Sequence, residues 1–167
     1  ATPQIWMIPI DGGEAIQLTR TETGVSSFAW SPAGDKLAYV SVSPKTAKEK
    51  RLESSGYGFV YFDEDLKHRN LFMMNAGSST LVGSPQQITK DISVWSFAFS
   101  PDGKSIAVAA SPRNHVDDSY MFQRIHILNL ETKAIKKLSS NPGKLGNFSF
   151  SPDGKYVVSR SWDYTAR

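Results

Sequence analysis

The side chains that could carry out catalysis are few in this sequence and lie far apart. There are three histidines, His68, His115 and His126, and no cysteine. A serine hydrolase places its nucleophile in Gly-x-Ser-x-Gly, a sharp turn that presents the hydroxyl between a strand and a helix. The nearest string, Gly77-Ser78-Ser79-Thr80-Leu81, lacks the second glycine. We therefore assign no catalytic residue to this chain, and without cysteine it can form no disulfide and no zinc–thiolate site.

Side chains with metal-ligand chemistry occur in two places. His115 lies close to Asp117 and Asp118, and nitrogen and oxygen donors of this kind suit several divalent metals. Residues 63–65 are Asp, Glu and Asp, but they lack the spaced ligands and the turn glycine of an EF-hand loop. We interpret both segments as solvated loops, and we predict no metal and no cofactor.

Charge and hydropathy argue against two kinds of partner. The formal net charge is only +3, and no aromatic stacking platform accompanies the basic cluster Lys45, Lys48, Lys50 and Arg51. Nucleic-acid binding sites combine a basic surface with such platforms, so we predict a solvated loop here and no nucleic-acid partner. No run of about 20 apolar residues is present, so we expect a soluble protein with no membrane span.

An internal repeat indicates which elements must position these side chains. One phrase of aromatic, small and turn residues occurs at 28–34, 97–103 and 148–154, each time before a short apolar run. Alternating aromatic and small residues predict a half-buried strand, Ser-Pro ends it, and the Asp-Gly that follows supplies a turn. The repeat therefore predicts β-hairpins. The first copy has Ala33-Gly34-Asp35 instead of Asp-Gly-Lys, which should weaken its turn.

Two further strand-like runs follow each hairpin, so the repeating unit has four strands. Residues 125–129 and 135–139 form one such pair, about ten residues before the next repeated phenylalanine, Phe148. Four-stranded units repeated in line are typical of propeller blades. We predict an all-β fold, a partial β-propeller of four-stranded antiparallel blades with about three blades' worth of strands. Its predicted parts are a half blade at 1–19, a full blade at 23–89 with an insertion at 43–69, a full blade at 93–139 and a half blade at 143–167.

The repeat carries a resemblance to a known family. The phrase Phe-x-Trp/Phe-Ser-Pro-Asp-Gly-Lys is coupled here to an opening pair, Ile5-Trp6-Met7-Ile8-Pro9 and Gln17-Leu18-Thr19. This combination resembles the PD40 repeat of TolB-like proteins and of the N-terminal β-propeller in prolyl oligopeptidase family serine peptidases. It is most similar to the bacterial acylaminoacyl-peptidase and dipeptidyl-peptidase-like members. The insertion at 43–69 also resembles the peptidase propellers, because it breaks the tight spacing of TolB-like repeats.

The resemblance implies a non-catalytic domain that gates peptide access to a hydrolase domain of the same parent chain, outside this sequence. We expect no enzymatic activity from this chain alone and a serine peptidase, bacterial cytoplasmic or periplasmic, as its parent. Blade extensions shape substrate access in such peptidases. The resemblance therefore selects Tyr57, Phe59 and Tyr61 of the insertion as contacts with peptide substrates. Their period-two aromatic pattern predicts an extra hairpin.

A second hypothesis is a TolB-like scaffold whose propeller mouth binds a protein partner. A Gly-x-Ser-x-Gly beyond Arg167 would select the peptidase, whereas a stop after further repeats would select the scaffold. A propeller enzyme with a metal in its axial channel would need inward-facing ligands that the sequence does not show. Because about three blades cannot close a ring, we expect either that the natural gene product is much longer or that isolated chains pair through open blade edges.

The aromatic residues divide into two groups. Six recur at one register of the repeat and predict packing between blades: Phe28, Trp30, Phe97, Phe99, Phe148 and Phe150. Trp95 and Trp162 fall outside that register and are candidates for facing a ligand. His126 interrupts an apolar strand, and we interpret it as a packed or edge residue rather than a general base.

Overall fold

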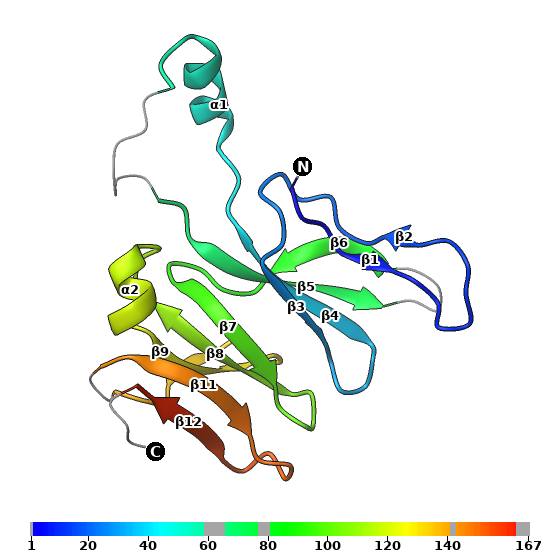
Figure 1. Ribbon diagram of the computed structural model, residues 1–167, viewed down its shortest axis with the longest axis vertical. Helices are drawn as coiled ribbons and strands as arrows, with labels where there is room; N and C mark the ends of the chain where they lie inside the picture. Colours follow the sequence, from blue (N-terminus) through cyan, green and yellow to red (C-terminus); the bar gives the residue numbers. More distant parts are fainter. Residues whose placement is uncertain (1, 59–65, 77–80, 141–142, 163–167) are drawn as a thin grey trace.

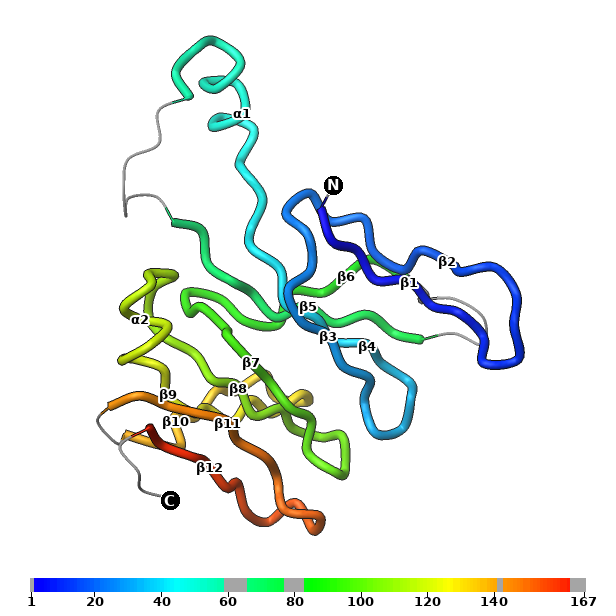
Figure 2. Tube along the Cα trace, in the orientation of Figure 1, coloured from blue at the N-terminus to red at the C-terminus, as the bar shows by residue number. Residues whose placement is uncertain are grey.

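Strands dominate the architecture of this chain (Figures 1 and 2). The computed structural model describes residues 2–58, 66–76, 81–140 and 143–162. Within them the elements run in the following order: β1 (Trp6–Met7), β2 (Ile16–Gln17), β3 (Ser27–Trp30), β4 (Lys36–Val42), α1 (Ala47–Ser54), β5 (Arg69–Ala76), β6 (Leu81–Gln87), β7 (Ser93–Phe99), β8 (Ser105–Ser111), α2 (Val116–Met121), β9 (Arg124–Asn129), β10 (Ile135–Lys137), β11 (Leu145–Phe150) and β12 (Val157–Ser161).

The strands form antiparallel sheets that follow one another in chain order. Two sheets have four strands each, β3 to β6 and β7 to β10, and the pairs β1–β2 and β11–β12 form two-stranded sheets. Strands adjacent within a sheet are consecutive in sequence, so each sheet is built of hairpins. Figure 1 shows the sheets as a series from β1–β2 to β11–β12. The all-β partial propeller with four-stranded antiparallel blades is therefore confirmed.

The repeated Ser-Pro-Asp-Gly phrase folds as a turn that its serine holds closed. The Ser100 hydroxyl donates to the Asp102 carboxylate at 2.6 Å and accepts from the Ser105 N–H at 2.9 Å. Gly103 has a φ of 68°, which glycine adopts without a Cβ clash. The hydrogen bond from Ser100, followed by that from the Lys104 N–H, lowers the pKa of Asp102 below its ordinary value of 3.8. The turn is thus fixed by side chains as well as by the ladder.

The divergent first copy keeps this turn with a different acceptor. The Ser31 hydroxyl donates to the Asp35 carboxylate at 2.7 Å, four residues on, whereas the acceptor in the second copy is two residues on. The Lys36 N–H donates to Ser31 Oγ at 3.0 Å. Asp35 therefore takes the place of the missing aspartate, and the serine has the same kind of bonds as in the other copies.

The largest core cluster lies between the two four-stranded sheets. Phe97 and Phe99 of β7 pack against it with their rings edge to face, 6.3 Å apart. Removing this apolar surface from water is what joins the two blades. The buried members are Ala38, Val40, Leu71, Val94, Ile106, Val108, Ala110 and Leu128.

Two smaller clusters attach the two-stranded sheets. Leu18 beside β2 packs with Tyr39 of β4, whose ring stacks on Phe72 at 5.4 Å. On the other side, Phe148 of β11 packs against Ile125 of β9. The sheets are therefore coupled face to face by apolar side chains.

The predicted packing of the repeat aromatics is confirmed for β7 and β11 but is wrong for β3. Phe28 is 59% exposed and Trp30 is 43% exposed. Strand register places them on the face of the sheet that also carries Tyr39 and Leu37. The first two-stranded sheet packs over Tyr39 and Leu37. Within the described residues, nothing buries the β3 edge of that face.

Candidate functional site

One end of the molecule carries both helices, and we call it the helix end. The β4–β5 connection, residues 43–68, contains α1, and the β8–β9 connection, residues 112–123, contains α2. In antiparallel hairpins every second connection returns to the same end of the sheet. Figure 1 shows α1 and α2 away from the hairpin turns of β3–β4, β7–β8 and β11–β12. The two longest described insertions therefore project from one side of the arc.

The basic segment of the 43–69 insertion is the helix α1 and not the predicted loop. The Thr46 side chain accepts from the Glu49 N–H at 3.2 Å, and the Glu49 carboxylate accepts from the Thr46 N–H at 2.6 Å. This reciprocal pair is a capping box. The Thr-x-x-Glu pattern is the sequence signal for this helix. No residue of α1 is buried, so the basic side chains still face solvent.

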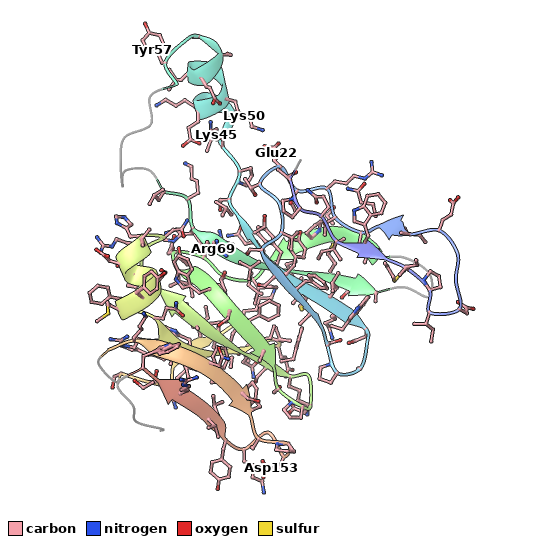
Figure 3. The ribbon with its side chains drawn as sticks, in the orientation of Figure 1. Glu22, Lys45, Lys50, Tyr57, Arg69 and Asp153 are labelled. Atoms are coloured by element: carbon pink, nitrogen blue, oxygen red, sulfur yellow. The ribbon has the colours of Figure 1, made fainter. Side chains whose placement is uncertain are left out.

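Two ion pairs involve side chains of α1, the helix of the 43–69 insertion. Lys45 Nζ lies 2.7 Å from the Glu53 carboxylate within the insertion. Lys50 Nζ lies 2.6 Å from the carboxylate of Glu22, on the connection between β2 and β3. Both residues are labelled in Figure 3. All four side chains are about half exposed, so these pairs contribute little stability.

Tyr57 lies at the outer end of the described part of the 43–69 insertion. Its N–H donates to the Leu52 carbonyl at 3.0 Å, just beyond the end of α1. Its side chain is 66% exposed and points away from the sheets in Figure 3. Phe59, Tyr61 and the hairpin predicted around them lie outside the described residues, as do positions 63–65 and 77–80. Substrate contact by these aromatic side chains stays a prediction.

The base of the 43–69 insertion is hydrogen-bonded both to α1 and to the β8–β9 connection, residues 112–123. The Lys67 ammonium hydrogen-bonds the Glu49 carboxylate, and the Asn114 side-chain amide donates to the Lys67 carbonyl at 2.8 Å. The bond from Lys67, followed by those from Thr46, lowers the pKa of Glu49 to about 2. Lys67 and Asn114 thus connect the two insertions of the helix end through side chains that are far apart in sequence.

A serine–histidine pair occurs at this base, but it is structural. His68 Nδ1 lies 3.0 Å from Ser93 Oγ. A nucleophilic serine must be reachable by substrate, and its base is normally oriented by a third group. Ser93 is fully buried, and no carboxylate of the described residues hydrogen-bonds to His68. The pair anchors the insertion to the start of β7.

Arg69, the first residue of β5, lies against Trp95 of β7. Its guanidinium carbon is 4.9 Å from the centroid of the Trp95 ring, and its Nε donates to the Val94 carbonyl at 3.3 Å. Burial lowers the pKa of Arg69, although an arginine stays charged at neutral pH. The indole N–H of Trp95 donates to Ser111 Oγ at 2.8 Å. Trp95, a candidate for facing a ligand, therefore connects β5 to β8 through internal contacts.

The predicted solvated turn around α2 is wrong for Asp118. Asp118 is 1% exposed, and its carboxylate accepts from Arg113 Nε at 3.1 Å and from Arg113 Nη2 at 3.0 Å. The backbone N–H of Arg113 adds a third bond. His115 is the residue that precedes the helix. In the described part of the chain, no group of three His, Cys, Asp or Glu residues could hold a metal ion.

The second sheet also contains His126, which is half buried in β9. Its Nδ1 lies 3.0 Å from the Arg124 carbonyl, so Nδ1 carries the hydrogen. Burial is the main cause that lowers the pKa of His126 below its ordinary value of 6.5. The prediction of a packed residue is confirmed.

Neither described helix is long and apolar enough to cross a bilayer.

Comparisons with known proteins agree with this architecture. The family model described as WD domain, G-beta repeat matches residues 132–167. The Bacillus subtilis (strain 168) protein described as uncharacterized peptidase YuxL is 29% identical over 155 residues, which are 93% of this chain and 18% of YuxL. The chain therefore spans less than a fifth of that relative's length.

Solved structures share the fold over most of the chain. TolB from Acinetobacter baumannii superposes with a TM-score of 0.63 at 21% identity, over 98% of this chain and 33% of TolB. A puromycin-hydrolyzing peptidase from Mycobacterium tuberculosis superposes with a TM-score of 0.55 at 14% identity, over 87% of this chain and 20% of the peptidase. Together with YuxL, these matches confirm the resemblance to TolB-like repeats and to the propellers of a peptidase family.

Proposed function

We propose that this chain is the non-catalytic propeller part of a prolyl-oligopeptidase-type serine peptidase and that its helix end controls which peptides reach a hydrolase domain outside this chain. The single observation that carries the proposal is the 43–69 insertion, an arm that projects from the sheets with an exposed aromatic, Tyr57, at its described tip. The 29% identity to a protein described as a peptidase supports the peptidase class.

The arm has the properties that a gate at a domain boundary needs. Its base is held by the Lys67 carbonyl, which accepts from Asn114, by His68, which lies against Ser93, and by Arg69, which donates to the Val94 carbonyl. Its helix buries no side chain against the sheets. A segment with a fixed base and an uncovered surface can contact a substrate or a second domain without disturbing the blades. The proposal assigns that contact to Tyr57, with Phe59 and Tyr61 as its neighbours in sequence.

The test compares long and short substrates in the parent peptidase. Tyr57→Ala and a variant that replaces 45–66 with a short glycine linker should raise kcat/KM for a peptide of about 30 residues severalfold. They should leave kcat/KM for a tripeptide within about twofold, because small substrates pass a gate either way. Tyr156→Ala is the matched control, since Tyr156 is a similarly exposed tyrosine (69%) at the opposite end of the molecule. Equal effects on both substrates, or equal effects of the two tyrosine variants, would contradict the gate.

A TolB-like scaffold that binds a protein partner is the second candidate. The likeness to TolB over 98% of the chain favours it, although that likeness concerns the fold alone. The scaffold predicts that the parent protein has no serine that a fluorophosphonate probe can label, and the peptidase predicts one such serine outside these 167 residues. This labelling separates the two candidates without knowledge of the substrate.

A further inference from the structure

A basic pocket lies between α2 and the second four-stranded sheet. It has a volume of about 380 Å³, which falls within the usual size range of small-ligand sites. The side chains that matter here are Arg113, Asp118, Phe122, Arg124, His126 and Lys137. They come from β9, β10 and the β8–β9 connection, so the fold brings together residues that are up to 24 positions apart.

Strand register explains why three basic side chains share this pocket. Arg124 and His126 are two residues apart in β9 and therefore project from the same face. Lys137 of β10 is paired with His126, and Ala110 of β8 is paired with Arg124. The small side chain of Ala110 leaves space beside the Arg124 guanidinium. Lys136, the neighbour of Lys137, points to the opposite face of the sheet.

The Arg124 guanidinium is held in place but keeps one edge for a ligand. Its Nη1 donates to the carbonyls of Met121 and Gln123 at 3.1 and 2.6 Å. Its Nε and Nη2 make no hydrogen bond to any of the described residues. These two N–H groups form the edge that binds a carboxylate in a bidentate manner. In the same pocket Arg113 binds the Asp118 carboxylate with that edge.

The charges of the pocket favour an anion. Asp118 is already bound by Arg113, and burial keeps His126 neutral at neutral pH. Arg124 and Lys137 then remain as positive charges that have no carboxylate partner among the described residues. Ile92, Ala110 and Phe122 give the pocket apolar walls, which suit a carboxylate carried on a hydrocarbon stem.

We propose that the basic pocket binds the carboxylate of an acidic side chain in a peptide, with Arg124 as the bidentate donor and Lys137 as the second positive charge. The stem of the acidic side chain lies along Phe122 and Ile92. The site belongs to the described chain itself, so it does not depend on the proposed role in a peptidase.

The experiment is an NMR titration of the ¹⁵N-labelled chain with two peptides. The first probe is the tripeptide Ala-Glu-Ala with an acetylated N-terminus and an amidated C-terminus, so that its side chain is its only charge. The second probe is the same peptide with glutamine in place of glutamate. We expect saturable shifts at the backbone amides of Arg124 and His126 with the first probe. The glutamine peptide should bind about tenfold more weakly or worse, because it loses a charge-assisted bidentate contact.

Three variants locate the contact. Arg124→Lys retains the charge but loses the fork and should weaken binding of the glutamate peptide about tenfold. Lys137→Gln should weaken it about three- to tenfold. Lys136→Gln removes the same charge from the opposite face of β10 and should change the dissociation constant by less than about twofold. If Arg124→Lys disturbs the fold, the comparison of Lys137→Gln with Lys136→Gln still decides the question, since both side chains are exposed.

Several results would overturn the proposal. Absence of saturable shifts, or equal affinity for the two peptides, would show that the pocket does not recognise a carboxylate. Equal losses for Lys136→Gln and Lys137→Gln would reduce the effect to overall charge. Inorganic phosphate is the third probe. If it displaces the glutamate peptide at concentrations similar to that of the peptide itself, the site is a general anion site and the assignment to an acidic peptide is wrong.

Discussion

Replacing Leu71 by alanine should destabilise this protein far more than removing the larger aromatic side chain of Phe28. Leu71 is fully buried in β5, within the cluster between the two four-stranded sheets. Buried leucine-to-alanine changes cost about 2–5 kcal/mol, and the cost is highest where the surroundings cannot collapse into the cavity. The neighbours of Leu71 belong to strands of both sheets, which are held by their ladders. We therefore expect about 3–5 kcal/mol.

Phe28 is the informative control because the repeat pattern predicts it to be part of the core. It is 59% exposed, so Phe28→Ala should cost under about 1 kcal/mol. The assay is equilibrium unfolding in urea, followed by tryptophan fluorescence and extrapolated to water. Unchanged m-values would show that the two variants differ in stability rather than in the mechanism of unfolding.

The measurement should be repeated over a range of protein concentrations. Similar losses for the two variants at every concentration would refute the assignment of Leu71 to the core and of Phe28 to an open face. A loss for Phe28→Ala that grows with concentration would instead support the proposed self-association, with a second copy covering β3. A strand face that is apolar and exposed is a common site of such association.

Three further predictions concern chemistry and pH. A fluorophosphonate probe should label no serine of this chain more than it labels the denatured chain; specific labelling of one serine would show a nucleophile that the structure does not assemble. Ser100→Ala removes the main cause of the lowered pKa of Asp102. The stabilisation linked to that lowered pKa is present above the ordinary value of 3.8 and is lost as the pH falls through the folded value. The cost of Ser100→Ala should therefore be larger at about pH 7 than at about pH 3, and a cost independent of pH in urea titrations would contradict this. Lys67→Met should raise the pKa of Glu49 from about 2 towards its ordinary value of 4.5, as a carboxyl-carbon NMR titration would report; an unchanged pKa would place the main cause elsewhere.

The hairpins and their order could be predicted from local patterns. The Ser-Pro-Asp-Gly phrase determines each turn within a few residues, since Ser100 bonds to Asp102 and Ser105. Alternation of apolar and polar residues is also short-range. The exception is α1, because its capping signal at Thr46 and Glu49 lies in a basic segment whose composition favours a solvated loop. Repetition of the same local pattern is what made the propeller recognisable.

The candidate site could be predicted only in part. Tyr57 is exposed at the tip of its arm, and its proposed role follows from the family resemblance. The contacts at the base of the arm, such as Asn114 with Lys67 and His68 with Ser93, join residues 47 and 25 positions apart. No pattern of spacing marks such pairs, because they exist only once two sheets and two insertions are packed together.

Turn chemistry and strand alternation act between near neighbours, so the all-β class, the four-stranded unit and the position of the insertion follow from local patterns in the sequence. Which side chains are covered and which charges are paired depends on how the sheets and insertions pack together. Phe28 and Phe97 occupy the same repeat position, yet the first is exposed and the second packs on the core, since burial depends on the sheet that lies opposite. Arg113 and Arg124 both line the basic pocket, yet Arg113 is bound to Asp118, whereas the Arg124 guanidinium bonds to backbone carbonyls among the described residues.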